Sequence, residues 1–174
     1  RFPWGSDPQA EERDIALMDT ATGEVTRWLI DAGTTIRSLT FSADGTRLYA
    51  ALTRNDIRAN LANLDEKSFE HLVVAYDTTT GAEVAKADLS RQSGSGGYAV
   101  ALHGLSLGKG ALWVAAEASD VLVALDPTSL TELRRVSAPG RPRTALAVGD
   151  TVWAHSGQGH AVHRFPALAP TGST

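Results

Sequence analysis

Histidine, arginine and aspartate are the residue types whose spacing could support chemistry here, because the chain contains no cysteine. His155, His160 and His163 lie close together in the sequence, and neutral imidazole is the commonest nitrogen ligand of protein-bound metals. The spacing H-x4-H-x2-H fits no helical zinc motif, and a strand would direct His160 and His163 to opposite faces. We therefore name His155 and His160 as candidate metal ligands. The simpler interpretation is that histidines at strand ends hydrogen-bond loop carbonyls.

A second group of polar side chains lies around segments that carry no strand pattern. Arg141 and Arg143 flank a proline in the sequence Ala-Pro-Gly-Arg-Pro-Arg, where two guanidinium groups could grip a carboxylate or phosphate in bidentate fashion. The alternative is a pair of solvated loop arginines. The candidates for a ligand- or partner-binding face are Arg54, Asn55, Asp56, Arg58, His103, Arg141 and Arg143.

The sequence shows no catalytic pattern. Serine, histidine and aspartate all occur, but no Gly-x-Ser-x-Gly elbow does, and the Gly-Ser-Gly-Gly run at 94–97 lacks the strand-to-helix context of a phosphate-binding loop. Catalysis requires an asymmetric constellation with shifted pKa values, whereas the prominent aspartates of this chain belong to a repeat. We predict no catalytic residue, no cofactor and no catalysis by this chain alone.

Composition excludes several other classes of function. The chain has 174 residues, of which 43% are hydrophobic and 21% charged, so it can bury a sizeable core. A formal net charge of −4 argues against sequence-independent nucleic-acid binding, which requires a basic surface. No apolar run approaches the roughly 20 residues that span a bilayer. Without cysteine the chain can form neither disulfides nor thiolate metal sites.

Short strands must position the candidate residues, because one hairpin phrase occurs three times. Residues 15–25, 72–84 and 121–133 each contain an apolar run ending in aspartate, a short polar turn and a second apolar run. The aspartates, Asp19, Asp77 and Asp126, are 58 and 49 residues apart, close to the period of a propeller blade. Gly23 and Gly81 supply positive φ, so each copy is predicted to be a β-hairpin whose aspartate forms the turn.

A second type of hairpin alternates with the first. An Asp-Gly pair separates apolar runs at 36–41 and 47–52, and similar pairs of runs recur at 105–115 and 144–155. No segment keeps a helical period over three turns, so we predict an all-β chain. The predicted strands are 14–19, 24–30, 36–41, 47–52, 71–77, 83–89, 105–107, 111–115, 121–126, 132–136, 144–148, 151–155 and 161–165. Residues 1–13 and 166–174 are predicted to be irregular. One helical turn is predicted at 59–64, within the polar segment 53–70.

The two hairpin types together resemble the YVTN-type repeat of β-propeller proteins. The resemblance rests on "LTFSADGTRLYAAL" at 39–52 and "LVVAYDTTTGAEV" at 72–84, and it covers residues 14–165. It implies a β-propeller of four-stranded antiparallel blades. With strands lettered A to D from the ring centre outwards, the chain supplies C-D, A-B-C-D, A-B-C-D and A-B-C. That is about three to three and a half blades. Trp28, Trp113 and Trp153 are then expected to be core wedges between blades.

A weaker similarity concerns function. Residues 71–89 resemble blades of amine dehydrogenase heavy chains, which implies, as one alternative function, the propeller subunit of an oxidoreductase. The candidate ligands His155 and His160 give the other alternative, an extracytoplasmic metal-binding propeller. Our first expectation is a non-catalytic scaffold or binding module, extracytoplasmic (periplasmic or secreted), with neither a membrane span nor a nucleic-acid partner. A propeller closes with about four to eight blades, so further blades are expected from another segment or chain. The simpler alternative is that the chain is one piece of a longer polypeptide.

Loop lengths indicate which face of the propeller binds. In an up-and-down blade the A–B and C–D turns lie on one face, and here they are all minimal. The long connections, 53–70, 90–102 and 138–143, all fall between strands B and C or between blades, and therefore lie on the opposite face. Elaborated loops on a rigid scaffold usually carry binding. We predict that any partner protein or ligand meets this second face, called the loop-rich face below.

Overall fold

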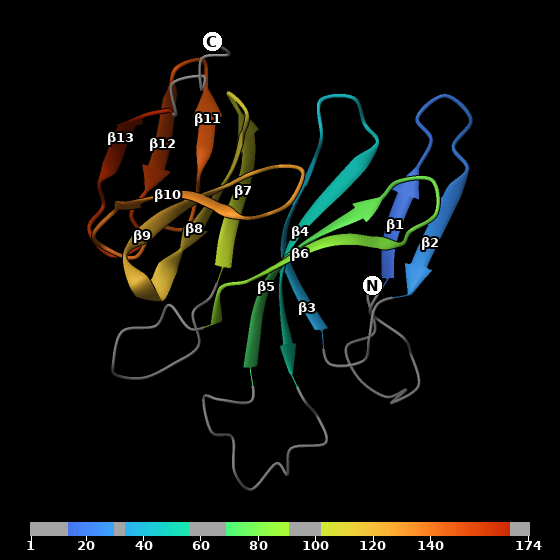
Figure 1. Ribbon diagram of the computed structural model, residues 1–174, viewed down its shortest axis with the longest axis horizontal. Helices are drawn as coiled ribbons and strands as arrows, with labels where there is room; N and C mark the ends of the chain where they lie inside the picture. Colours follow the sequence, from blue (N-terminus) through green and yellow to red (C-terminus); the bar gives the residue numbers. More distant parts are fainter. Residues whose placement is uncertain (1–13, 30–33, 56–68, 91–101, 168–174) are drawn as a thin grey trace, which may run out of the picture.

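The computed structural model describes residues 14–29, 34–55, 69–90 and 102–167, which form four antiparallel sheets arranged in an arc (Figure 1). The first sheet contains β1 (Asp14–Met18) and β2 (Val25–Leu29). The second contains β3 (Thr34–Phe41), β4 (Arg47–Asn55), β5 (Phe69–Asp77) and β6 (Glu83–Asp88). The third contains β7 (Leu102–Gly108), β8 (Ala111–Ala116), β9 (Val121–Leu125) and β10 (Glu132–Ser137). The fourth contains β11 (Leu146–Val148), β12 (Thr151–His155) and β13 (Val162–Pro166).

These sheets confirm the predicted grouping of strands into blades of two, four, four and three. Every predicted strand has a counterpart, with ends that differ by a few residues. β7 begins at Leu102 rather than at 105, because a bulge between His103 and Leu105 lets the strand continue past an irregular step. His103 therefore lies inside β7 and not before it. The predicted helical turn at 59–64 lies outside the described residues.

The turn role predicted for the recurring aspartates is confirmed. In the β5–β6 turn, Asp77 Oδ1 accepts hydrogen bonds from the backbone N–H groups of Thr79 and Thr80, at 3.0 and 2.8 Å. Asp19 and Asp126 make the same pair of bonds in their own turns. Because these local contacts repeat, the hairpins form wherever the sequence phrase occurs.

Apolar faces of neighbouring sheets pack against each other and bury the core. One cluster joins the second and third sheets around Tyr49, Val73, Leu112 and Val123. A separate cluster joins the third and fourth sheets around Trp113, which is 0% exposed. Tyr49 and Trp113 are both the third residue of a B strand, and each points towards the next blade along the chain.

Small residues on the inner strands let adjacent blades approach closely. A Cβ at Gly108 of β7 would collide with the Cβ of Ala147 on β11. In the same contact Ser106 Oγ accepts a hydrogen bond from the Ala147 N–H at 2.9 Å. Ser38 of β3 plays a similar part for the blade before, accepting from the Leu105 N–H at 3.0 Å.

The prediction that Trp153 is a buried wedge is wrong for the part of the chain that the structure describes. It is 39% exposed, and Arg164 stacks over its ring at 5.9 Å from the centroid. Its position in β12 matches that of Trp113 in β8, but among the described residues no blade follows β13 to cover it. Leu146, Val148 and Val162 are also exposed on this end face. The side chain of Trp28 lies outside the described residues.

Antiparallel order alternates the connections between the two faces of the arc, as predicted. The described connections on the loop-rich face are the 117–120 turn, the 138–145 segment and the 156–161 turn. On the opposite face, the A–B turns of the third and fourth sheets are linked by an ion pair between Lys109 and Asp150. Residues 56–68 and 91–101 of the predicted long connections lie outside the described residues.

Replacing the two tryptophans tests the direction of packing. We expect Trp113→Ala to lower the free energy of unfolding by about 3–5 kcal/mol, because it removes a fully buried aromatic side chain. Trp153→Ala should cost about 1 kcal/mol or less, the scale of an exposed cation–π contact. Urea unfolding of both variants measures the difference. Equal losses would contradict the assignment of Trp153 to an uncovered face.

The close approach of β7 and β11 can be tested by a compensating pair. We expect Gly108→Ala to cost about 1–3 kcal/mol, because the new methyl group overpacks the contact with Ala147. Ala147→Gly in the same chain should restore part of that loss, although glycine weakens a strand by itself. The free energies of unfolding of the two single variants and the double variant give the coupling energy. A coupling energy near zero would show that the two strands do not meet at these residues.

Candidate functional site

A buried glutamate organises the loop-rich face of the third and fourth sheets. Glu117 begins η3 (Glu117–Ser119), a single helical turn between β8 and β9, and its side chain is 7% exposed. Ala116 before it is extended, and Asp120 after it has φ +53°, so the chain reverses within four residues. This reversal leaves the Glu117 carboxylate facing the neighbouring loop and not the solvent.

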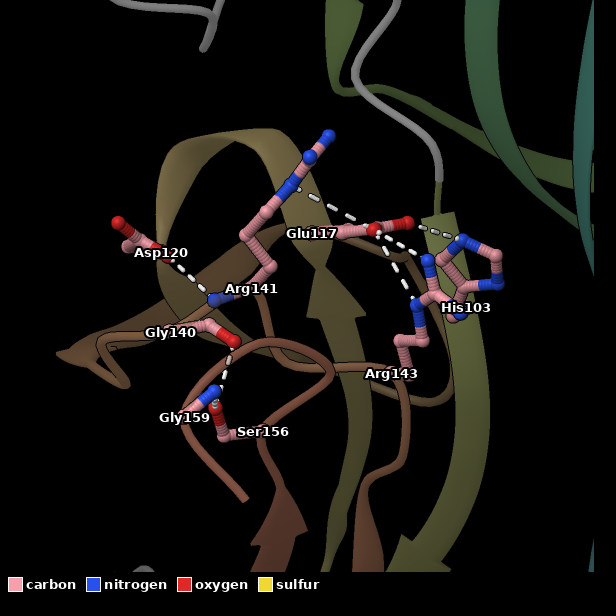
Figure 2. A network of polar contacts seen from close by, with 8 residues as sticks. All are labelled: His103, Glu117, Asp120, Gly140, Arg141, Arg143, Ser156 and Gly159. Carbon is pink, nitrogen blue, oxygen red and sulfur yellow. Dashed lines mark hydrogen bonds and ion pairs between the residues drawn. The ribbon is translucent and has the colours of Figure 1, made fainter. Parts of the chain in front are cut away.

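Three basic side chains converge on that carboxylate (Figure 2). His103 Nε2 lies 2.7 Å from Glu117 Oε2. Arg143 donates from Nε and Nη2 to Glu117 Oε1, at 3.2 and 3.1 Å. Arg141 Nε lies 3.5 Å from the same oxygen. One anion therefore fixes residues from β7 and from the segment between β10 and β11.

The balance of burial and hydrogen bonding decides the charge of Glu117. Burial alone would raise the pKa of this carboxyl, because desolvation disfavours the charged form. The hydrogen bonds from Arg143 and His103 outweigh burial, and they hold the pKa below its ordinary value. Glu117 is therefore an anion at neutral pH.

The 138–145 segment is held by hydrogen bonds from both of its neighbours. Asp120 Oδ1 accepts from the Arg141 N–H at 2.7 Å, and the Asp120 carbonyl accepts from the Ala138 N–H at 2.7 Å. From the other side, Ser156 Oγ donates to the Gly140 carbonyl at 2.6 Å. Gly140 has φ +90°, and a Cβ there would collide with Ser156 Oγ, so only glycine fits this position.

Backbone contacts also fix the two arginines. The Arg141 carbonyl accepts from the Gly157 N–H at 2.8 Å, and the Arg143 N–H donates to the His155 carbonyl at 3.0 Å. The side chains of Arg141 and Arg143 nevertheless remain 43% and 57% exposed. The arrangement thus presents two guanidinium groups on an immobilised backbone.

The structure brings three of the predicted binding-face residues together: His103, Arg141 and Arg143. The sequence analysis missed the residue that joins them, Glu117. The sequence did contain a signal for Glu117, because it is a single carboxylate placed directly after the fully buried run Ala111–Ala116. Such a carboxylate must find a partner when the strand is packed.

The other predicted binding-face residues lie apart from this cluster. Arg54 in β4 pairs with Glu83 at 3.0 Å. Asn55 ends β4, and its side chain lies outside the described residues, as do Asp56 and Arg58 altogether.

His155 and His160, the two candidate metal ligands, have no third metal-binding side chain grouped with them among the described residues. His155 ends β12 and His160 lies in the following turn, and both are exposed. His163 of β13 stacks on Phe165 at 6.2 Å between ring centroids. Within the described segments no three histidine, aspartate or glutamate side chains form a group that could hold a metal ion. The metal pair stays a prediction.

No family model matches this chain, and no curated protein matches it. Solved structures do. The hydrazine synthase of Kuenenia stuttgartiensis superposes with a TM-score of 0.75 at 13% identity, over 92% of this chain and 53% of that chain. A chain of the mitotic checkpoint complex gives a TM-score of 0.65 at 16% identity, over 89% and 41%. The computationally designed Ika4 protein gives 0.61 at 14% identity, over 91% and 82%.

These similarities show the fold. The chain spans about half the length of the hydrazine synthase chain and less than half of the checkpoint chain. Both of those neighbours are β-propeller proteins, and the sheets described above match their blades. In the part of the chain that the structure describes, no helix is long and apolar enough to cross a membrane. The chain has the fold of a partial β-propeller of three to four blades.

Proposed function

We propose that the chain is one arc of a β-propeller that acts as a non-catalytic scaffold and presents its loop-rich face to a partner protein or ligand. The observation that carries the proposal is the convergence of His103, Arg141 and Arg143 on buried Glu117. In this cluster a buried carboxylate holds basic side chains in place at the rim of a rigid scaffold. Preorganised binding sites are built in this way.

The same cluster argues against catalysis by these residues. A catalytic acid or base needs a pKa near the working pH, whereas the cations around Glu117 lower its pKa. Ser156 lies beside the 138–145 segment, but its Oγ donates to the Gly140 carbonyl and accepts from the Gly159 N–H, so these contacts do not pair it with a base. No described contact bears on the alternative of an oxidoreductase subunit, which stays a prediction from the sequence.

The proposal includes further blades at the end of the arc. Trp153 occupies the same place on the fourth sheet as Trp113 does on the third. The fourth sheet buries Trp113, and a further blade would bury Trp153 in the same way. The repeat type that we favour is YVTN-like, because its turn chemistry matches the observed aspartate turns. The expected extracytoplasmic location belongs to the same proposal, and fractionation of the source cells tests it.

The double variant Arg141→Ala/Arg143→Ala tests binding at the loop-rich face. Wild type and double variant are each purified from the native source. Mass spectrometry then identifies the most abundant macromolecule or ligand that co-purifies with the wild type, and compares its amount in the two preparations. We expect at least a tenfold loss in the double variant, because truncating charged anchors of an interface typically costs more than about 1.4 kcal/mol. Arg135→Ala, which removes an arginine paired with Glu132 on the outer strand, is the matched control and should change nothing. Full recovery with the double variant would place binding elsewhere.

The organising role of Glu117 predicts a pH-dependent loss of stability. We expect Glu117→Gln to lower the free energy of unfolding by about 1–3 kcal/mol at neutral pH, because it weakens the charge-assisted hydrogen bonds to His103 and Arg143. Since folding lowers the pKa of Glu117 below 4.5, its contribution is present above the unfolded pKa and disappears as the pH falls through the folded pKa. The difference between wild type and variant should therefore shrink towards pH 3, measured by urea unfolding.

A control removes the contribution of other acidic groups. Glu132→Gln breaks an exposed pair with Arg135 and should cost less than about 0.5 kcal/mol at every pH. A Glu117→Gln effect that stays constant between pH 7 and pH 3 would show that its charge is not what stabilises the fold.

A further inference from the structure

We propose that the uncovered end face of the fourth sheet accepts a further propeller blade whose inner strand has glycine at the position facing Val148, and that a second copy of this chain does not fit there. The inference rests on the proposed function, because it concerns the further blade that the proposed function includes. It goes further in predicting one residue of that blade and in excluding self-association as the way in which the arc is extended. The fourth sheet forms one end of the arc (Figure 1).

The contact between the third and fourth sheets shows how closely two inner strands approach. A Cβ at Gly108 of β7 would collide with the Cβ of Ala147 on β11, but it would lie 3.6 Å from the Cα of Ala147, an ordinary van der Waals distance. Ser106, two residues before Gly108, accepts a hydrogen bond from the Ala147 N–H at 2.9 Å and so holds the strands at this spacing. At this spacing one of the two facing residues must be glycine.

The end face of the fourth sheet has larger side chains at the corresponding places. Leu146 takes the place of Ser106, and Val148 takes that of Gly108, because each pairs with the corresponding position of its neighbouring strand. Leu146 and Val148 are 55% and 56% exposed. A blade that approaches β11 as closely as β11 approaches β7 meets Val148 where Gly108 would be. The glycine must therefore come from the incoming blade.

The occupant is a blade because this end face repeats an interface that the arc already contains. Trp113 is covered by the two inner strands of the fourth sheet and the residue that precedes them, through Val152, Ala154 and Ala145. Trp153 is the third residue of its strand, as Trp113 is, but it is 39% exposed. Two inner strands of a further sheet cover Trp153 by the same contact once they can approach β11.

A second copy of this chain offers the wrong side chain to Val148. Head-to-tail packing would bring the second copy's β3 towards β11, because β3 is the inner strand nearest the other end of the arc. The β3 residue in the place of Ala147 is Phe41, since both pair with the second residue of the neighbouring strand. Phe41 would meet Val148 where Ala147 meets Gly108, and overpacking of this size forces the strands apart.

The test extends the full chain by one blade. Residues 131–167 are repeated after Thr174, so that the copied β10 adds an outer strand to the fourth sheet and the copied β11, β12 and β13 form the new blade. In one fusion the copied Ala147 carries Ala147→Gly, and in the matched fusion it carries Ala147→Phe, which reproduces the side chain of Phe41.

The measurement is the exposure of the original Trp153. The chain is labelled with 5-fluorotryptophan, the copied tryptophan carries Trp153→Phe, and broadening of each ¹⁹F resonance by a soluble paramagnetic agent is recorded. We expect Trp153 to broaden as little as buried Trp113 in the Ala147→Gly fusion, and as much as in the unextended chain in the Ala147→Phe fusion. Equal protection in both fusions would overturn the glycine requirement.

A compensating pair tests the same contact without a glycine in the new blade. With the copied Ala147 unaltered, Val148→Gly in the original blade reproduces the contact of Gly108 with Ala147, so Trp153 should become protected. The same fusion with Val148 retained should leave Trp153 exposed. Protection of Trp153 in the fusion that retains both Val148 and Ala147 would show that the end face accepts a larger residue than we infer.

The unextended chain tests the exclusion of a second copy. Sedimentation equilibrium should show a monomer, and the broadening of Trp153 should not change with protein concentration. A dimer in which Trp153 is protected would overturn the exclusion.

This inference and the proposed function fail in different ways. If the Ala147→Gly and Ala147→Phe fusions both protect Trp153, the glycine requirement is wrong and the further blade of the proposed function stands. If neither these fusions nor the compensating pair protects Trp153, the further blade is wrong as well. Binding at the loop-rich face is measured separately, by co-purification.

Discussion

Face-to-face packing of neighbouring sheets is the constraint on which the rest of this structure depends. No sheet here can cover its own apolar faces, so each relies on the blades that lie next to it. Trp113 is buried only because the fourth sheet lies against it, and that sheet can lie there only because Gly108 leaves room for Ala147. The close inner contact sets the distance between blades, and therefore the positions of the loops that join them.

Loop geometry on the loop-rich face follows from that packing. With the third and fourth sheets fixed, the 117–120 turn and the 138–145 segment are brought together, and Glu117 must accept hydrogen bonds because it cannot reach bulk water. The basic residues that satisfy it are thereby immobilised. A stability requirement, pairing a buried carboxylate, thus produces an organised set of cationic side chains at the rim. The same contacts hold the pKa of Glu117 below its ordinary value.

Much of the fold could be predicted from the sequence, because hairpins depend on local interactions. The aspartate turns are specified within a few residues, and alternation of apolar residues then fixes each strand and its face. The errors arise where distant segments decide the outcome. Trp153 is the third residue of its strand, as Trp113 is, and only the presence of a following blade distinguishes the buried ring from the exposed one. Glu117 was missed because its partners lie 14 to 26 residues away, on β7 and on the segment that leads to the fourth sheet, although His103, Arg141 and Arg143 could each be named from the sequence.

The charge state of Glu117 is the most direct test of this account. A ¹³C NMR titration of its side-chain carboxyl carbon, in the intact folded chain, reports the pKa without reference to unfolding. The account predicts a midpoint below 4.5, the ordinary value for glutamate, because the hydrogen bonds from Arg143 and His103 outweigh burial. A midpoint above 4.5 would mean that burial prevails, that the basic side chains do not converge on this carboxylate, and that the loop-rich face is not organised as described.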